Sequence, residues 1–175
     1  MAKFKYIILA FISIIVLSSC SDELATNPNT FDKPDLELGS DAPNFVMMNE
    51  QNQDFQLESL KGQIVLLDFW ATWCHNCVNE LPKLEELKEE YKDRNFEILS
   101  VSLDENLDSW RSFIKNRDLM WKHVADGRGW DNEVATLYNV RAIPYVYLID
   151  QEGKIAWRGY VNFTTIRQEI DKLLE

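Results

Sequence analysis

The chain has 175 residues, of which 27% are charged, and a formal net charge of −11. This length suits a single domain with a sizeable core. The acidic balance argues against nucleic acid as a partner, because a phosphate backbone binds basic surfaces.

Residues 1–19 have the layout of a secretory signal. Lys3 and Lys5 precede an apolar stretch over residues 6–17, which is shorter than the roughly 20 residues of a membrane-spanning helix. The segment Leu17-Ser18-Ser19-Cys20 resembles a bacterial lipobox, where the chain is cleaved before a cysteine that is then lipid-modified. We therefore expect a lipoprotein signal peptide over 1–19 and acylation of Cys20, with a membrane-spanning N-terminal anchor as the alternative.

Residues 20–38 are predicted to be a flexible tether between the lipid and the domain. The segment is polar, contains two prolines and lacks an apolar period. The domain itself is expected over residues 39–175. Either form of anchor places this domain outside the cytoplasm and close to a membrane.

The first strands of the domain are expected over residues 45–48 and 54–57, on either side of a turn at 49–52. Residues 64–70 follow as an apolar run that is typical of a buried central strand. Asp68 interrupts this run. It is either a polar residue that is satisfied locally or a buried carboxyl group with a function.

Cys74 and Cys77 lie two residues apart, where this strand gives way to a helix. The start of a helix offers unpaired N–H groups and a positive dipole end, and both stabilise a thiolate. Cys74 is therefore predicted to be the nucleophile, and Cys77, one helical turn later, to form a disulfide with it and resolve mixed disulfides. A structural disulfide or half of a zinc site are the alternatives, although zinc normally takes four ligands and the chain has three cysteines and two histidines.

The rest of the chain alternates helices with strands. Residues 80–91 carry Leu81, Leu84 and Leu87 at helical spacing, with Pro82 expected to bend the helix. The later elements are predicted as strands over 96–103, 121–124, 145–149 and 154–159 and helices over 107–116, 131–138 and 163–174, with turns at 127–129 and 150–153. This order indicates an α/β three-layer sandwich that ends in a hairpin and a helix.

Several ordered motifs resemble the TlpA/ResA-like thiol–disulfide oxidoreductases of the thioredoxin superfamily, in their lipoprotein form. These motifs are Gly39 to Phe45, Leu60-Lys61-Gly62, Trp73-Cys74-His75-Asn76-Cys77 with Glu80 and Pro82, Ile143-Pro144, and Leu148 to Ile155. The resemblance implies a thioredoxin-like α/β/α sandwich with an N-terminal β-hairpin extension.

The resemblance also assigns roles to single residues. Asp68 matches the buried acid of thioredoxins, which moves the proton of the resolving cysteine, and burial should raise its pKa toward neutrality. Glu80 corresponds to a residue near the redox pair, with a role in proton handling or partner contact, although a plain surface glutamate fits equally well. Ile143-Pro144 should contain a cis bond that faces the cysteines. Tyr145 departs from the small threonine that is usual in the family at this position.

The expected function is a lipid-anchored oxidoreductase of the bacterial cell envelope, facing the periplasm or the cell exterior. It would reduce protein disulfides, for example in cytochrome c maturation, with electrons from a membrane thiol carrier and without a metal or organic cofactor. The substrate would be bound by five residues around the cysteines, namely Trp73, His75, Asn76, Ile143 and Pro144. A cationic His75 would favour the thiolate and make the pair more oxidising, whereas Asp68 and Glu80 would disfavour the thiolate.

Two other functions remain open from the sequence. A thiol peroxidase needs a Pro-X-X-X-Thr-X-X-Cys pattern, which the residues before Cys74 do not supply. A copper-binding or copper-delivery module would use Cys74, Cys77 and a histidine, either His75 or His123.

Overall fold

A computed structural model of the chain describes residues 36–175. The expected signal peptide, the acylated Cys20 and all but the last three residues of the expected tether lie outside the described residues. Of those three, Leu36 packs partly against the core of the domain. No helix within the described part of the chain is long and apolar enough to cross a membrane.

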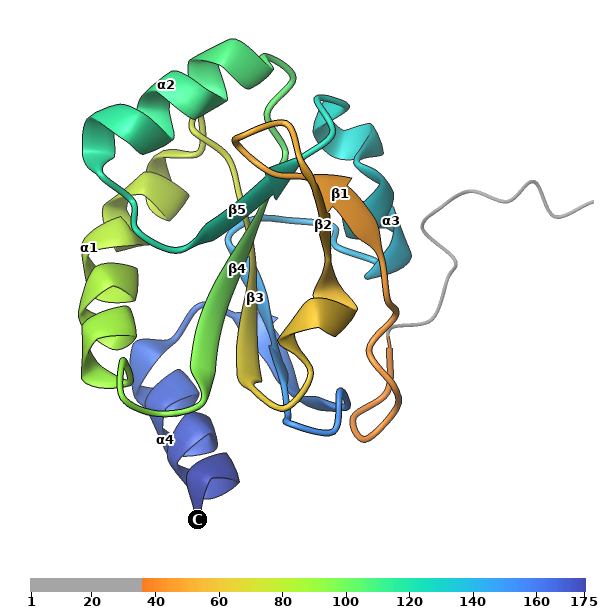
Figure 1. Ribbon diagram of the computed structural model, residues 1–175, viewed down its shortest axis with the longest axis vertical. Coiled ribbons are helices and arrows are strands. Elements are labelled where there is room, and N and C mark those ends of the chain that lie inside the picture. The colour runs from red at the N-terminus through yellow and green to blue at the C-terminus, as the bar shows by residue number, and fades with distance from the viewer. Residues whose placement is uncertain (1–35) are drawn as a thin grey trace, which may run out of the picture.

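A five-stranded mixed sheet forms the centre of the domain, in the order β5-β4-β3-β6-β7 (Figure 1). The strands are β3 (Ile64–Trp70), β4 (Phe96–Ser102), β5 (Lys122–Ala125), β6 (Tyr145–Ile149) and β7 (Ile155–Tyr160). The first three run parallel to one another, and β6 and β7 are antiparallel to their neighbours. All seven residues of β3 are buried, Asp68 included, and the apolar residues on both sides of Asp68 predict this for a strand covered on both faces.

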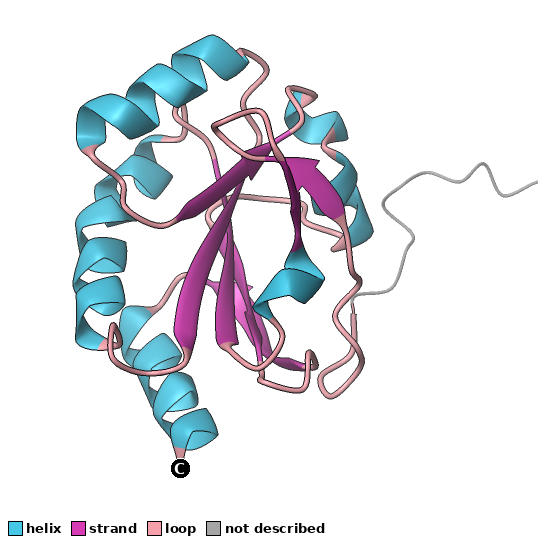
Figure 2. Ribbon diagram, viewed as in Figure 1, coloured by secondary structure: helices cyan, strands magenta, loops and turns pink. Residues whose placement is uncertain are grey.

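Helices cover both faces of this sheet and make the three layers of the sandwich (Figures 1 and 2). On one face lie α1 (His75–Glu90), α2 (Leu107–Arg117) and α4 (Phe163–Leu174). The other face carries α3 (Glu133–Leu137), the 3₁₀ turn η1 (Leu57–Leu60) and the antiparallel hairpin of β1 (Val46–Met48) and β2 (Asp54–Gln56). The predicted fold class, including the N-terminal hairpin, is therefore confirmed.

The direction of each crossover explains this division. The chain steps from β3 to β4 and from β4 to β5 in one direction, and right-handed crossovers then place α1 and α2 on the same face. It steps back from β5 to β6, so α3 falls on the opposite face. Two adjacent residues of β3 mark the two sides. The Trp70 ring contacts Phe113 of α2 at 5.8 Å between centroids, and the Phe69 ring contacts Tyr138, just after α3, at 5.8 Å.

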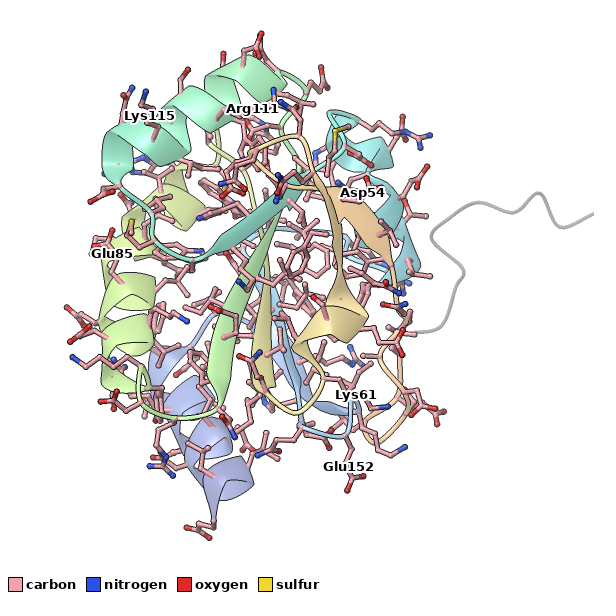
Figure 3. All side chains as sticks on the ribbon, viewed as in Figure 1. Asp54, Lys61, Glu85, Arg111, Lys115 and Glu152 are labelled. Atoms are coloured by element: carbon pink, nitrogen blue, oxygen red, sulfur yellow. A yellow bond between two sulfur atoms is a disulfide. The ribbon has the colours of Figure 1, made fainter. Side chains whose placement is uncertain are left out.

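The helices are amphipathic in the way their spacing predicts. Leu81, Leu84 and Leu87 of α1 are buried against the sheet. Figure 3 shows Glu85 of α1 and Lys115 of α2 pointing outward, away from the packed side chains between the layers. The bend expected at Pro82 stays a prediction.

One predicted helix begins later than expected. The sequence predicts a single helix over residues 131–138, but the segment forms a 3₁₀ turn, η2 (Gly129–Asp131), and a separate α3. Asn132 divides them because its backbone, with φ −53° and ψ 128°, is not helical and its side chain caps α3 by accepting the N–H of Ala135 at 2.8 Å. The same side chain donates to Asp126 at 2.9 Å, a tertiary contact that local propensity does not encode.

Candidate redox site

The cysteine pair lies where β3 ends and α1 begins. Cys74 is the N-cap of α1 in an extended conformation, and its Sγ accepts the backbone N–H of Cys77 at 3.2 Å. The two residues form a disulfide, and both are buried. A backbone donor and the positive end of a 16-residue helix therefore converge on Cys74 Sγ, which is the arrangement that stabilises a thiolate after reduction.

The loop before Cys74 is fastened by a buried carboxylate, Asp104, that the sequence analysis did not single out. Thr72 donates its N–H to Asp104 Oδ2 at 3.0 Å and its hydroxyl to Oδ1 at 2.6 Å. Ser102 at the end of β4 donates its hydroxyl to the same carboxylate at 2.6 Å. In the sequence, Asp104 could have been noticed only as a polar residue just past the carboxyl end of a parallel strand. Ligand-binding and active sites in α/β sheets are commonly found at this end. Asp104 thus fixes the approach to the disulfide.

Asp68 is a buried carboxyl group in the middle of the sheet, 2% exposed. It faces Ser100 in register on β4, and the Ser100 hydroxyl donates to Asp68 Oδ2 at 3.0 Å. Trp121 donates its Nε1–H to the same hydroxyl at 2.9 Å, which leaves the Ser100 proton free for Asp68. Burial raises the pKa of Asp68 to about 7; the Ser100 hydrogen bond acts in the opposite direction, and the charge of Glu80 raises it further.

Glu80 lies on α1, one turn beyond Cys77, and is half-buried. Burial raises the pKa of Glu80 above its ordinary value, and nearby Lys83 partly offsets this. The charge of Glu80 acts on Asp68, which shows that the two carboxyl groups are near each other. Both have raised pKa values, and both lie on the side of the sheet that α1 covers.

The Ile143-Pro144 peptide bond is cis, as predicted. Tyr145, the first residue of β6, pairs in register with Phe69 near the end of β3, so this loop lies at the same end of the sheet as the cysteines. Ile143, Pro144 and Tyr145 are half-buried. The Tyr145 hydroxyl accepts a hydrogen bond from Arg158 at 3.2 Å, which ties the unusual residue to β7.

The surface around the disulfide is aromatic. Trp73, His75 and Asn76 are all exposed, as a substrate-binding role requires. Trp73 is 55% exposed, and its ring lies 6.3 Å from that of Trp130, centroid to centroid. Trp130 is itself 50% exposed and belongs to η2. The sequence analysis did not select Trp130, because only the return of the chain from β5 brings it to Trp73.

His123, the distant histidine of the copper alternative, is buried on β5 between the rings of Trp70 and Trp121. Burial lowers its pKa to about 3. The nearby carbonyl of Leu119 opposes this, although its geometry falls outside a hydrogen bond. A neutral histidine packed between two indoles has the surroundings of a core residue. Within residues 36–175, no group of three or more His, Cys, Asp or Glu side chains is placed to hold a metal ion.

Known proteins share this fold and motif. Residues 38–158 match the model of the AhpC/TSA family. Thiol-disulfide oxidoreductase ResA of a Bacillus cereus strain is 36% identical over 149 residues, covering 84% of this chain and 84% of that protein. The protein of the same name from Geobacillus kaustophilus is 31% identical over 164 residues, covering 94% of this chain and 91% of that protein.

Solved structures of thiol-disulfide oxidoreductases have a similar fold. A thiol-disulfide oxidoreductase from Bacteroides fragilis superposes with a TM-score of 0.71 at 31% identity, covering 77% of this chain and 100% of that chain. The thioredoxin domain of a thiol-disulfide oxidoreductase from Bacteroides vulgatus gives a TM-score of 0.72 at 28% identity, covering 80% and 99%. The chain therefore belongs to the AhpC/TSA family of thioredoxin-like fold and is a thiol–disulfide oxidoreductase similar to ResA.

Proposed function

We propose that this oxidoreductase reduces protein disulfides in the bacterial cell envelope, with Cys74 as the attacking thiol. The observation that carries the proposal is the position of Cys74 at the N-cap of α1, where its sulfur accepts the N–H of Cys77. Such an environment stabilises the thiolate form, which is the nucleophile in thiol–disulfide exchange. Cys77 lies inside the helix and is the more deeply buried of the two.

The proposed cycle transfers two electrons. The Cys74 thiolate attacks one sulfur of a substrate disulfide, so that a Cys74–substrate disulfide forms and the other substrate sulfur leaves as a thiolate. Cys77 then loses its proton and attacks Cys74 Sγ. The Cys74–Cys77 disulfide forms, and the second substrate sulfur leaves and takes up a proton. A dithiol donor, which we propose is a membrane thiol carrier, reduces the pair again.

Asp68 is proposed to take the proton of Cys77 in the second step. A pKa of about 7 supports this role, because a base whose pKa is near the working pH both accepts and returns a proton efficiently. Glu80, one turn after Cys77 and with its pKa also raised, is proposed to assist the same transfer from the half-exposed side of α1.

The substrate is proposed to bind as an extended segment between two surfaces. Trp73, His75 and Asn76 supply one of them, and the Ile143-Pro144 loop at the same end of the sheet supplies the other. We propose the disulfides of proteins in cytochrome c maturation as the substrate class, in line with the resemblance to the TlpA/ResA-like proteins. The half-buried Tyr145, which replaces the usual threonine, narrows the choice of segments that fit.

The location of the protein is proposed from its N-terminal sequence. Lipid attached to Cys20 would hold the domain at the membrane, facing the periplasm or the cell exterior, through a tether that ends near Leu38. The acidic net charge of the chain disfavours direct contact with anionic lipid, so the anchor rather than the domain surface would supply membrane attachment.

A trapping experiment tests the chemistry. Cys77→Ser removes the resolving thiol, so the prereduced variant should accumulate a mixed disulfide with oxidised envelope proteins, seen on a non-reducing gel and reversed by a reductant. Cys74→Ser is the matched control and should trap nothing. Accumulation with Cys74→Ser alone would reverse the roles of the two cysteines.

A further inference from the structure

We infer that Trp73 and Trp130 form an aromatic clasp beside the disulfide, and that the clasp receives an arginine or lysine adjacent to the reactive cysteine of a protein substrate. The inference deepens the proposed function and rests on it, because it takes Cys74 as the sulfur that the substrate meets.

The clasp is an exposed apolar feature at the reactive end of the fold. Each indole has about half of its surface open to solvent, and the two rings contact each other at 6.3 Å between centroids. Scattered exposed hydrophobic residues are ordinary, but paired aromatic rings next to a nucleophile are typical of a recognition surface. Among the exposed aromatic side chains of residues 36–175, these are the two whose rings touch.

Both rings stand on loops that are already fixed. The residue before Trp73 is Thr72, which makes two hydrogen bonds to the buried Asp104. The turn that carries Trp130 is held by Asp126, which accepts the backbone N–H groups of Arg128 at 3.0 Å and Glu133 at 2.9 Å. Binding therefore orders little of the protein, and this preorganisation lowers the entropic cost of association.

Unpaired carboxylates adjoin the clasp and select the charge of its occupant. The Glu105 side chain packs against Gly129, the residue before Trp130, so closely that a Cβ added to Gly129 would lie 2.9 Å from Glu105 Oε1. Asp131 directly follows Trp130 in the chain. Both acidic residues are exposed, and neither makes an ion pair within the described residues. The nearby cation Arg128 is already paired with Glu133.

Ring faces and carboxylates together favour a cation. The face of an indole attracts ammonium and guanidinium groups, and tryptophan does so better than the other aromatic residues. The stem of an arginine or lysine packs on apolar surface while its charged head stays near the carboxylates. A glutamate in the same place would meet Glu105 and Asp131 with the wrong sign.

Single-turnover kinetics with disulfide peptides test the inference. The prereduced full-length chain is mixed with peptides that contain an intramolecular disulfide and differ only in the residue before the first cysteine, which is arginine, citrulline, leucine or glutamate. Citrulline keeps the shape of arginine without the charge. We expect the arginine peptide to react about two- to five-fold faster than the citrulline peptide and the glutamate peptide to be slowest.

Variants of Trp130 distinguish the effect of an aromatic ring from the effect of apolar surface alone. Trp130→Leu should lower the ratio between the arginine and citrulline rates to the part that Trp73 and the carboxylates supply, whereas Trp130→Phe should lower it less. Met120→Ala is the matched control, because Met120 is 77% exposed and precedes β5, at the opposite end of the sheet. This variant should keep the wild-type ratio.

The possible outcomes test the cationic clasp and the proposed disulfide reduction separately. A leucine peptide that reacts faster than the arginine peptide, or an arginine preference that is undiminished in Trp130→Leu, overturns the cationic clasp while the redox function stands. Loss of reaction with every peptide contradicts the proposed function, and the clasp falls with it.

Discussion

Replacing Asp68 by asparagine should stabilise the folded chain at alkaline pH and have little effect near pH 4. The pKa of Asp68 is about 7 in the folded chain, against an ordinary value of 3.8. At about 1.36 kcal/mol per pKa unit, this difference corresponds to a penalty of about 4 kcal/mol for carrying the ionised carboxylate in the fold. A penalty of this size is a large share of the stability of an ordinary domain.

The sign follows from which state holds the proton. Below pH 3.8, Asp68 is protonated in both the folded and the unfolded chain and costs nothing. Between pH 3.8 and 7, the unfolded chain ionises while the folded chain stays neutral, so the free energy of unfolding falls as the pH rises. Above pH 7, both states are ionised, and the penalty stays constant. Asparagine is neutral throughout and never incurs this penalty.

Urea unfolding of the disulfide-bonded protein between pH 4.5 and pH 8.5 measures this effect. The difference in unfolding free energy between Asp68→Asn and wild type should grow by about 3–4 kcal/mol across this range. A difference that is the same at both ends would refute the reasoning, because any fixed packing or hydrogen-bond effect of the amide cancels in the comparison. His123, with its pKa lowered from 6.5 to about 3, adds its own pH dependence because the unfolded chain protonates it, but this contribution is the same in both proteins and cancels in the comparison.

Ser100→Ala is the matched control for the same carboxyl group. It keeps Asp68 but removes the hydroxyl that donates to it at 3.0 Å. Without this donor the pKa of Asp68 should move higher, so this variant should lose more stability at pH 8.5 than at pH 4.5, opposite in sign to Asp68→Asn. Removal of the hydroxyl also leaves Trp121 Nε1 without its partner, a cost that is independent of pH.

Two further predictions concern the anchor and the direction of electron flow. Metabolic labelling with a fatty acid should tag the wild-type chain and miss Cys20→Ala, and equal labelling of both would argue against the lipoprotein signal. A glutathione-buffered titration of the Cys74–Cys77 pair should give a potential near that of thioredoxin, about −270 mV, whereas a value near the roughly −120 mV of strong oxidants would reverse the proposed direction.

The parts of the fold that could be predicted are those where one local signal is strong. The bounds of β3, β6 and α4 match the predicted ranges, because mostly apolar runs and a helical apolar stripe leave few other choices. The helix predicted over 131–138 begins only at Glu133, for the opposite reason. Asn132 is buried and hydrogen-bonded across the fold, and these contacts outweigh the weak local preference for one helix.

The candidate site also contains residues that could be predicted from the sequence and residues that could not. The cysteine pair, Asp68 and Pro144 could be selected because they fall within short motifs that belong to a known family. Asp104 and Trp130 belong to no such motif. Asp104 reaches Thr72 only because β3 and β4 pair in register, and Trp130 reaches Trp73 only because the chain returns over the end of β5. Local sequence therefore identified the reacting groups, whereas tertiary structure supplied the residues that position the loop and adjoin the substrate surface.

The raised pKa of Asp68 bears on how such a protein is directed to one task. If Asp68 carries the proton of Cys77 as proposed, a carboxyl group with a pKa of about 7 accepts and returns that proton with almost equal ease near neutral pH. Proton transfer then favours neither reduction nor oxidation of the substrate. The direction must come from the relative potentials of the partners and from which partner can dock. Because Glu105 and Asp131 adjoin the clasp and have no part in the proposed thiol and proton steps, changing either residue to its amide should alter the choice of partner more than the rate of thiol chemistry.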